Sequence, residues 1–191
     1  MSPAARRTLD LALSRPARLG GSRLLCVDGP AGSGKTTFAE GLAQGGSRAG
    51  RSVSVVHLDD VYAGWSGLDT VGDRLLRLVV EPLARGEPGL FPRWDWHGSE
   101  WAEDVEVPVA DLVVLEGVGS GHPRISPYVA VLLWIEAPDD LRLQRGVDRD
   151  GAGLLPHWPA WTAAETVLHR RERTRERADL VVDGVTGAFR D

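Results

Sequence analysis

Residues 29–36 read Gly-Pro-Ala-Gly-Ser-Gly-Lys-Thr and match the phosphate-binding pattern G-x-x-x-x-G-K-[ST]. Glycines let backbone N–H groups turn inward around phosphate oxygens. In this pattern Lys35 reaches the terminal phosphates of a nucleotide, and the Thr36 hydroxyl holds Mg²⁺. Lys35 is also the only lysine of the chain, and its compact ammonium group fits a phosphate-wrapped loop where a wider guanidinium does not. The residues that we expect to bind the phosphates of ATP are Gly29, Ala31, Gly32, Ser33, Gly34, Lys35, Thr36 and Thr37.

Acidic residues follow two other short apolar segments. Asp59 and Asp60 come directly after residues 52–58, and Glu116 comes directly after residues 111–115. If these segments are parallel strands, the acids lie at the same sheet edge as the phosphate loop, where ligands bind. We expect Glu116 to hold Mg²⁺, directly or through water. One of the two aspartates is expected to accept the proton of an incoming hydroxyl group, and strand alternation does not decide between them.

Three arginines repeat at helical spacing later in the chain. Arg142, Arg145 and Arg149 stand at positions i, i+3 and i+7, so a helix places them on one face. Three guanidinium groups on one face suit a triphosphate during phosphoryl transfer. We therefore expect Arg142 to bind ATP, and Arg145 and Arg149 to act in catalysis. The alternative is that they form salt bridges with nearby acids, which are Asp139, Asp140 and Asp148.

Short apolar segments alternate with segments of helical periodicity along the chain. This alternation is typical of an α/β fold with a five-stranded parallel sheet and helices on both faces. Strands are expected at residues 23–28, 52–58, 111–115, 129–135 and 180–182, and helices at residues 3–18, 34–43, 70–85, 138–149 and 159–177. Residues 91–108 contain three tryptophans and predict a small hairpin inserted beside the sheet. At 191 residues we expect one domain.

The composition argues against several classes of protein. A net charge of −5 and an isoelectric point near 5.6 argue against a nucleic-acid-binding surface. The chain has no run of about 18 apolar residues, so no membrane span is predicted. The N-terminal stretch lacks the apolar core of a signal peptide. Cys26 is the only cysteine, so no intrachain disulfide forms, and the five histidines lack the spacing of zinc ligands. We expect a cytoplasmic protein without structural zinc, and the sequence leaves the oligomeric state open.

Several stretches together resemble the uridine kinase-like branch of the P-loop kinases. They follow the order of that family over most of the chain and are residues 28–37, 58–62, 94–96, 114–117, 141–150 and 177–182. The resemblance implies that Asp59 is the catalytic base and lies near the metal. It implies that Tyr62 and Trp94 hold a nucleobase, and that either Asp69 or Asp73 binds a ribose.

The resemblance also implies a flap over the acceptor and a lid over the nucleotide. The flap is at about residues 89–108 and the lid at about residues 142–157. Trp65, Trp96 and His97 stand in or near the expected acceptor pocket, so we expect them to bind the acceptor. The chain departs from the family at three points: Trp94 replaces a tyrosine, His97 comes earlier than the family's histidine, and no later lid arginine follows Arg149.

Three functions are compatible with these residues. The first is a kinase that uses ATP with Mg²⁺ and moves the γ-phosphate to a hydroxyl group of a small molecule, with nucleosides such as uridine or cytidine as candidates. The second is a P-loop ATPase or nucleotide-binding switch that acts on a protein partner. A GTPase switch is excluded because its Asn-Lys-x-Asp guanine motif needs asparagine, which the chain lacks. The third, a nucleotide binder without chemistry, is disfavoured by the intact Lys35, Thr36, Asp59 and Glu116.

Overall fold

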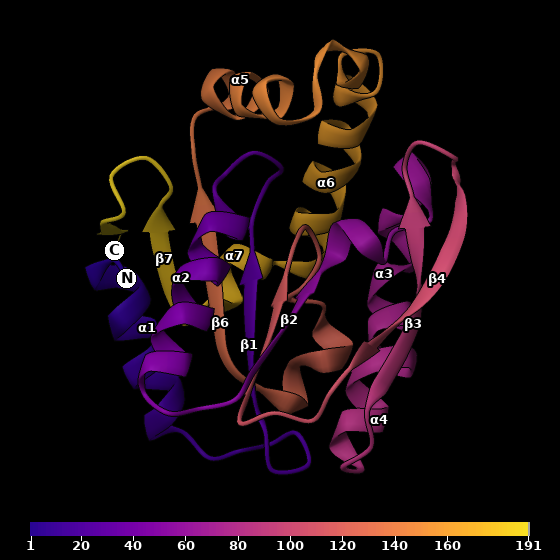
Figure 1. Ribbon diagram of the computed structural model, residues 1–191. Helices are drawn as coiled ribbons and strands as arrows, with labels where there is room; N and C mark the ends of the chain where they lie inside the picture. The colour runs from indigo at the N-terminus through magenta and orange to yellow at the C-terminus, as the bar shows by residue number, and fades with distance from the viewer. Residues whose placement is uncertain (191) are drawn as a thin grey trace.

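A six-stranded sheet forms the centre of the molecule in the computed structural model, which describes residues 1–190 (Figure 1). The strand order is β2-β5-β1-β6-β7-β8. The strands are β1 (Arg23–Asp28), β2 (Val53–His57), β5 (Leu112–Glu116), β6 (Val129–Glu136), β7 (Leu180–Asp183) and β8 (Phe189–Arg190). The first five are parallel to their neighbours, which confirms the predicted α/β fold. The sequence does not predict β8, a two-residue strand antiparallel to β7 at the sheet edge, because it is too short to show a strand pattern.

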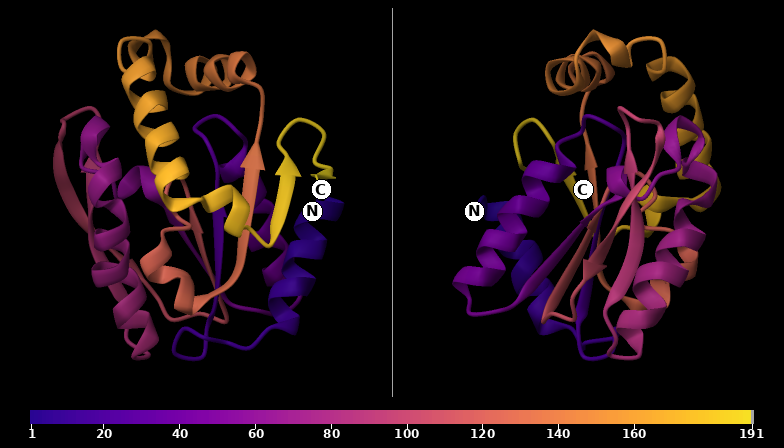
Figure 2. Two further views of the ribbon diagram at one scale, coloured as in Figure 1. Left: turned by 180° about the vertical axis from the view of Figure 1, so that it is seen from behind. Right: turned by 45° about the vertical axis from the view of Figure 1, so that its right-hand side comes forward.

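Helices cover both faces of the sheet (Figures 1 and 2). One face is covered by α1 (Pro3–Ser14) and α2 (Lys35–Arg48), and the other by α3 (Leu68–Leu75), α4 (Glu81–Ala84) and α6 (Trp158–Glu172). Along β1, Leu24 and Cys26 belong to the core on the α3 side, whereas Leu25 and Val27 belong to the core under α1 and α2. This alternation explains why β1 is apolar throughout: each of its faces is buried under helices.

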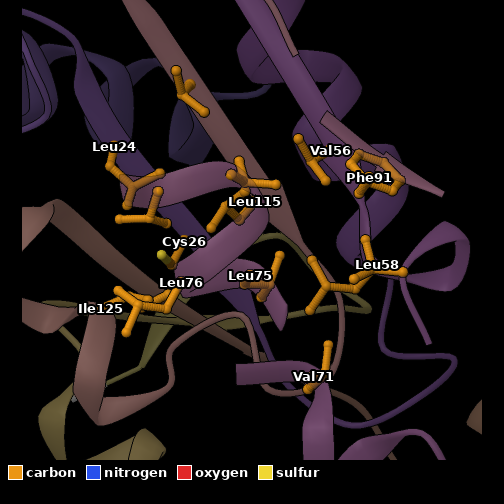
Figure 3. Close-up of a cluster of buried hydrophobic side chains, with 14 of the residues drawn as sticks. Leu24, Cys26, Val56, Leu58, Val71, Leu75, Leu76, Phe91, Leu115 and Ile125 are labelled. Atoms are coloured by element: carbon orange, nitrogen blue, oxygen red, sulfur yellow. The ribbon is translucent and has the colours of Figure 1, made fainter. Parts of the chain in front are cut away.

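The larger core lies between the sheet and α3 (Figure 3). Leu24 and Leu115 come from neighbouring strands, and Val71 and Leu75 from α3. Full burial of such a side chain contributes about 1.5–3 kcal/mol. The packing therefore fixes β1 and β5 relative to each other, and these are the strands that lead into the phosphate loop and Glu116.

The helix after the phosphate loop is longer than predicted. The pair Gly45 and Gly46 indicates an end near residue 43, but α2 continues to Arg48. A Cβ atom at Gly45 would lie 2.2 Å from the Met1 sulfur, and one at Gly46 would lie 2.7 Å from a Val53 methyl group. These glycines are therefore sites of close packing against α1 and β2, not helix terminators.

Three other helices also differ from their predicted bounds. The predicted helix at 3–18 ends at Ser14. The predicted helix at 70–85 begins at Leu68 and includes a π-helical segment, Leu76–Val80, before α4. The predicted helix at 159–177 is interrupted at Arg173, whose φ of 51° is left-handed. The short helix α7 (Thr174–Arg177) follows this break and leads into β7.

A hairpin and a helical arch flank the carboxyl edge of the sheet. The hairpin consists of β3 (Gly89–Asp95) and β4 (Glu100–Val107), which confirms the predicted insertion. The arch consists of α5 (Asp139–Asp150), the 3₁₀ turn Ala152–Leu154 and the upper part of α6, and it passes above β1 and β6 (Figure 1). Across residues 1–190, none of the helices has the length and apolar character that crossing a membrane requires.

Candidate active site

The phosphate loop is the turn that joins β1 to α2. Gly29, Gly32 and Gly34 have φ values of 143°, 75° and 104°, which disfavour any residue with a side chain. A Cβ atom at Gly29 would also lie 2.0 Å from the Ile135 carbonyl oxygen. Gly34 caps α2 without a side-chain hydrogen bond, so the first N–H groups of the helix are left for an anionic ligand.

Lys35 is a nearly buried ammonium group at the start of α2. Its Nζ donates a hydrogen bond to the Pro30 carbonyl oxygen at 2.9 Å, so it folds back over the loop. Burial lowers the pKa of Lys35, while the charges of Glu116 and Glu165 oppose that shift. A charge that is desolvated in this way gains strongly from an anion placed beside it.

The Glu116 carboxylate is hydrogen-bonded both to the phosphate loop and to β2. It is buried at the end of β5, and its Oε1 accepts a hydrogen bond from the Thr36 hydroxyl at 3.1 Å. The same oxygen lies 2.6 Å from Nδ1 of His57, and this hydrogen bond raises the pKa of His57. The sequence analysis does not predict a role for His57. Its position at the end of β2, two residues before Asp59, is the feature that could have indicated one.

Asp59 and Asp60 lie in the 3₁₀ turn Leu58–Asp60 and face different surroundings. Desolvation raises the pKa of Asp59, and the charge of Glu116 raises it further. The charges of Arg149 and Lys35 lower it. Its Oδ2 lies 3.4 Å from Nη1 of Arg149. Asp60 instead lines a groove of about 260 Å³ between β2 and β4. The structure thus brings Asp59, and not Asp60, to the side of the lid and the phosphate loop.

The three lid arginines occupy different positions on α5. Arg142 is buried, and its guanidinium donates to Glu165 at 2.7 Å, to Asp139 at 2.9 Å and to the Ala31 carbonyl at 3.0 Å. Arg145 donates to the carbonyl oxygens of Gly32 and Gly184 at 3.2 and 3.0 Å.

In this structure burial and three protein acceptors engage the guanidinium of Arg142, so its contact with ATP stays a prediction. Its ion pair with Asp139 is the predicted alternative. Arg145 likewise donates its hydrogen bonds to backbone carbonyl groups, one of which belongs to the phosphate loop. Arg149 is 61% exposed and reaches Asp59 and Asp150, so it is the lid arginine that faces the open edge of the sheet.

Two of the predicted acceptor tryptophans lie beside Asp59. Trp96 donates its Nε1 hydrogen to the Asp59 carbonyl oxygen at 2.9 Å, and its ring meets Trp65 edge-on at 5.0 Å. Trp65 stacks in parallel on His157 of the lid, with ring centroids 4.6 Å apart. Trp65, Trp96 and His157 form a continuous aromatic surface next to the candidate base, which we call the aromatic cluster.

Tyr62 does not reach this surface. Its ring is fully buried, its hydroxyl donates to the Val118 carbonyl at 2.8 Å, and burial raises its pKa well above the ordinary value. Its ring meets Trp161 edge-on at 5.1 Å. A ring without exposed surface contributes to the wall behind the aromatic cluster, so the contact of Tyr62 with the acceptor stays a prediction.

The remaining predicted acceptor residues are spread around the hairpin and α3. Trp94 is half-buried and packs edge-on against Trp101 of the opposite strand at 4.8 Å. His97 is exposed at the hairpin turn and donates its backbone N–H to Asp95. Asp69 lies 3.7 Å from Arg171, and Asp73 pairs with Arg124. That either Asp69 or Asp73 binds the acceptor stays a prediction.

Two buried acids at the phosphate loop were not predicted. Asp28 is fully buried and accepts the N–H groups of Gly29, Gly119 and Gly121 at 2.7, 3.0 and 2.8 Å. Burial alone would raise the pKa of Asp28, but the hydrogen bond and charge of His169 and the N–H groups of Gly121 and Gly119 hold it below its ordinary value. The available signal was its place directly before the loop, at the end of an apolar strand.

Glu165 is the second of these acids. It lies on α6 and accepts the N–H of Ala31 at 2.8 Å. The sequence feature that could have predicted its burial is the spacing of Glu165 from Trp161 and Leu168, which places an acid on the apolar face of the helix.

The oxygen atoms at the loop fit Mg²⁺ bound together with a nucleotide. Within residues 1–190, no three or more histidine, cysteine, aspartate or glutamate side chains are grouped to hold a metal. The Thr36 hydroxyl and the Glu116 carboxylate provide two hard oxygen donors at hydrogen-bond distance from each other. Mg²⁺ is usually bound by one or two such groups plus substrate phosphates and water, so this small donor set is sufficient.

Comparison with known proteins relates the fold to P-loop kinases. No family model matches the chain. A structure described as a possible uridine kinase from Bacillus stearothermophilus superimposes with a TM-score of 0.68 at 22% identity, covering 93% of this chain and 96% of that one. The D-glycerate 3-kinase of Cryptococcus neoformans superimposes with a TM-score of 0.59 at 15% identity, covering 100% and 99%.

A curated relative is similar in sequence. The cytidylate kinase of Methanococcoides burtonii is 30% identical over 132 residues, which are 69% of this chain and 65% of that protein. The match thus spans just under two thirds of the relative's length. Together these similarities confirm the resemblance to uridine kinase-like and related P-loop kinases at the level of the fold.

Proposed function

We propose that this chain, which has the fold of the P-loop kinases, is a phosphotransferase that moves the γ-phosphate of ATP to a hydroxyl group of a small molecule. The observation that carries the proposal is the convergence of three neighbouring strands. In the order β2-β5-β1, β2 leads into the turn that holds Asp59, β5 ends at Glu116, and β1 leads into the phosphate loop. A proton acceptor, a metal-binding acid and a phosphate cradle are the parts that phosphoryl transfer needs side by side.

The proposed roles follow from these positions. The loop N–H groups and Lys35 bind the β- and γ-phosphates. Thr36 and Glu116 hold Mg²⁺, which when bound neutralises charge on the phosphates. The acceptor oxygen bonds to the γ-phosphorus as the bond to the β–γ bridging oxygen breaks, and ADP keeps the leaving electron pair. Asp59 accepts the proton of the acceptor hydroxyl, and Arg149 lies across from it to stabilise the charge that spreads over the transferred group.

The proposed acceptor carries an aromatic ring. The aromatic cluster borders Asp59 and offers faces on which a base can stack, at a gain of roughly 1–3 kcal/mol. Nucleosides such as uridine and cytidine combine such a ring with a hydroxyl group. The names of the relatives point to a uridine kinase and a cytidylate kinase, although one structural neighbour is a D-glycerate kinase. The hairpin at residues 89–107 is the proposed acceptor flap, and residues 142–157 are the proposed lid.

An acceptor screen tests this function. The wild-type protein is incubated with ATP and Mg²⁺, and ADP release is followed in a coupled assay with uridine, cytidine, cytidylate, D-glycerate and other hydroxyl compounds. We expect ADP release to depend on one class of acceptor. ADP release at the same rate without any acceptor would instead favour the alternative, an ATPase or nucleotide-binding switch that acts on a protein partner.

A further inference from the structure

Glu165 is a buried acid that the proposed transfer does not use. It lies on α6 with 1% of its surface exposed. Its Oε2 accepts the N–H of Ala31 in the phosphate loop at 2.8 Å, and its Oε1 accepts from Nη1 of Arg142 on α5 at 2.7 Å. A buried carboxylate is tolerated only when it is paired and hydrogen-bonded. Both of its partners belong to the nucleotide end of the molecule, one to the loop and one to the lid.

The lid side chains hold the tip of the phosphate loop by its backbone. Nη1 of Arg142 also donates to the Ala31 carbonyl at 3.0 Å, so the two backbone groups of Ala31 are bonded to α5 and to α6. Arg145 donates to the Gly32 carbonyl at 3.2 Å. A Cβ atom at Gly32 would lie 2.4 Å from the Arg142 carbonyl oxygen, so the backbones of the loop and α5 are also in close contact.

The direction of these peptide groups decides how the loop binds phosphate. A phosphate loop works through N–H groups that already point at the ligand. The N–H of Ala31 is bonded to Glu165, so the groups left for phosphate are the later N–H groups of the loop, and their direction depends on how the Ala31 peptide is held. We propose that Glu165 is a positioning residue that fixes the Ala31 peptide and the Arg142 guanidinium, and thereby prepares the loop for the phosphates of ATP. The proposal rests on the proposed function in that ATP binds at this loop, but it does not depend on the acceptor.

Glu165 lies midway along the buried face of α6. Trp161, one turn earlier, contacts both Tyr62 and Trp65 edge-on. His169, one turn later, lies 3.2 Å from Asp28 at the foot of the loop. The buried face of α6 therefore runs from the aromatic cluster past the tip of the phosphate loop to its base, and Glu165 is the point at which this face bonds the tip (Figure 2 shows the course of the helix).

The test is direct nucleotide binding to Glu165→Gln. Glutamine keeps the size of the side chain but removes the charge and places an amide NH₂ against one of its two donors, the Arg142 guanidinium or the Ala31 N–H. We expect the Kd for ADP and for ATP, measured by calorimetry, to rise by about 10- to 100-fold, the usual effect of removing a partner that orients a binding group. The KM of the acceptor at saturating ATP should change by less than about twofold, because Glu165 has no contact with the acceptor side.

Glu172→Gln is the matched control. Glu172 is also buried on α6, seven residues later on the same face, but it pairs with Arg171 and His122 and not with the loop. We expect this variant to lose stability while its Kd for ADP stays at the wild-type value. If both variants bind ADP equally weakly, general destabilisation explains the effect and the positioning role is overturned.

Further variants separate the remaining outcomes. Should Glu165→Gln fail to fold, Glu165→Asp keeps the charge but shortens the reach, and the same rise in Kd is expected. Wild-type ADP affinity in a folded Glu165 variant would overturn the proposal. If no acceptor is ever phosphorylated but the Kd pattern holds, the proposed kinase function fails while the role of Glu165 stands. If the wild-type protein binds neither ADP nor ATP, both proposals fall.

Discussion

At the scale of single residues, Lys35 is placed to bind the phosphates and Asp59 to accept a proton. Lys35 is the only lysine, and burial lowers its pKa, so its ammonium group is held where an anion would stabilise it. Asp59 is held between opposite influences, desolvation that raises its pKa and Arg149 that lowers it. Lys35 was predicted from its motif. Strand position left Asp59 and Asp60 open, and the resemblance to the kinase family singled out Asp59. The burial of Tyr62 and Arg142 was not predicted, because a sequence does not reveal which side chains tertiary packing will bury, and their ligand contacts stay predictions.

Lys35→Ala should abolish phosphoryl transfer and leave the fold intact. The alanine removes the charge that the γ-phosphate needs, while α2 keeps its length because alanine favours helices. Turnover is measured with the best acceptor from the screen, and thermal unfolding serves as the control for the fold. Wild-type turnover in a variant of unchanged thermal stability would show that this loop is not the phosphate site.

Asp59→Asn should reduce kcat by about 10²–10⁴-fold, the usual contribution of a positioned base. Asparagine keeps the shape of the side chain and cannot accept the proton. Asp60→Asn should cost much less, because Asp60 faces the groove between β2 and β4. The two variants are compared at saturating ATP, acceptor and Mg²⁺, and a magnesium titration separates loss of base from weaker metal binding. If Asp60→Asn is the more damaged of the two, Asp59 is not the base.

At the scale of elements, α6 and the hairpin bring to the site side chains that no local sequence motif predicts. The hairpin brings Trp96 to Asp59, and α6 brings Glu165 and His169 to the phosphate loop. The existence of both elements was predicted, the hairpin from its run of tryptophans and α6 from its periodicity. Their contacts were not, since each contact joins residues that are far apart in the sequence.

Trp65→Ala should raise the KM of the acceptor by about tenfold or more and leave the KM of ATP nearly unchanged. The reason is that base–aromatic stacking contributes roughly 1–3 kcal/mol. Trp101→Ala is the control, because Trp101 is as exposed as Trp65, at 39% against 38%, but packs on Trp94 and Arg74 instead of the aromatic cluster. Steady-state kinetics with both substrates varied give the two values. An equal rise in both KM values would mean that Trp65 has only a structural role.

Asp28→Asn should destabilise the fold by about 1–3 kcal/mol at neutral pH, because an amide N–H₂ would meet backbone N–H donors in a buried site. The folded state holds the pKa of Asp28 below its ordinary value, so its stabilisation is complete above that ordinary value and is lost as the pH falls through the lower, folded one. The difference between wild type and variant should therefore shrink below about pH 4. Urea unfolding at several pH values measures it, and a difference that stays constant down to acid unfolding would contradict the role of the charge.

For the whole molecule, the order of strands matters more than any single motif. Because β2, β5 and β1 are neighbours, their carboxyl ends deliver Asp59, Glu116 and the phosphate loop to one place. The five parallel strands were predicted because each is a short apolar run between helices. The sixth strand, the continuation of α2 through Gly45 and Gly46, and the π-helical segment were not, because they depend on packing between distant parts of the chain.

Transfer of a labelled phosphate is the most direct measurement of the proposed chemistry. The wild-type protein is incubated with Mg²⁺, the best acceptor from the screen and ATP labelled in its γ-phosphate, and the products are separated and identified by mass. We predict that the label appears on the acceptor hydroxyl, in step with ADP, and that Lys35→Ala produces neither. Label found solely in inorganic phosphate, at a rate that the acceptor does not change, would contradict the assignment of this protein as a small-molecule kinase.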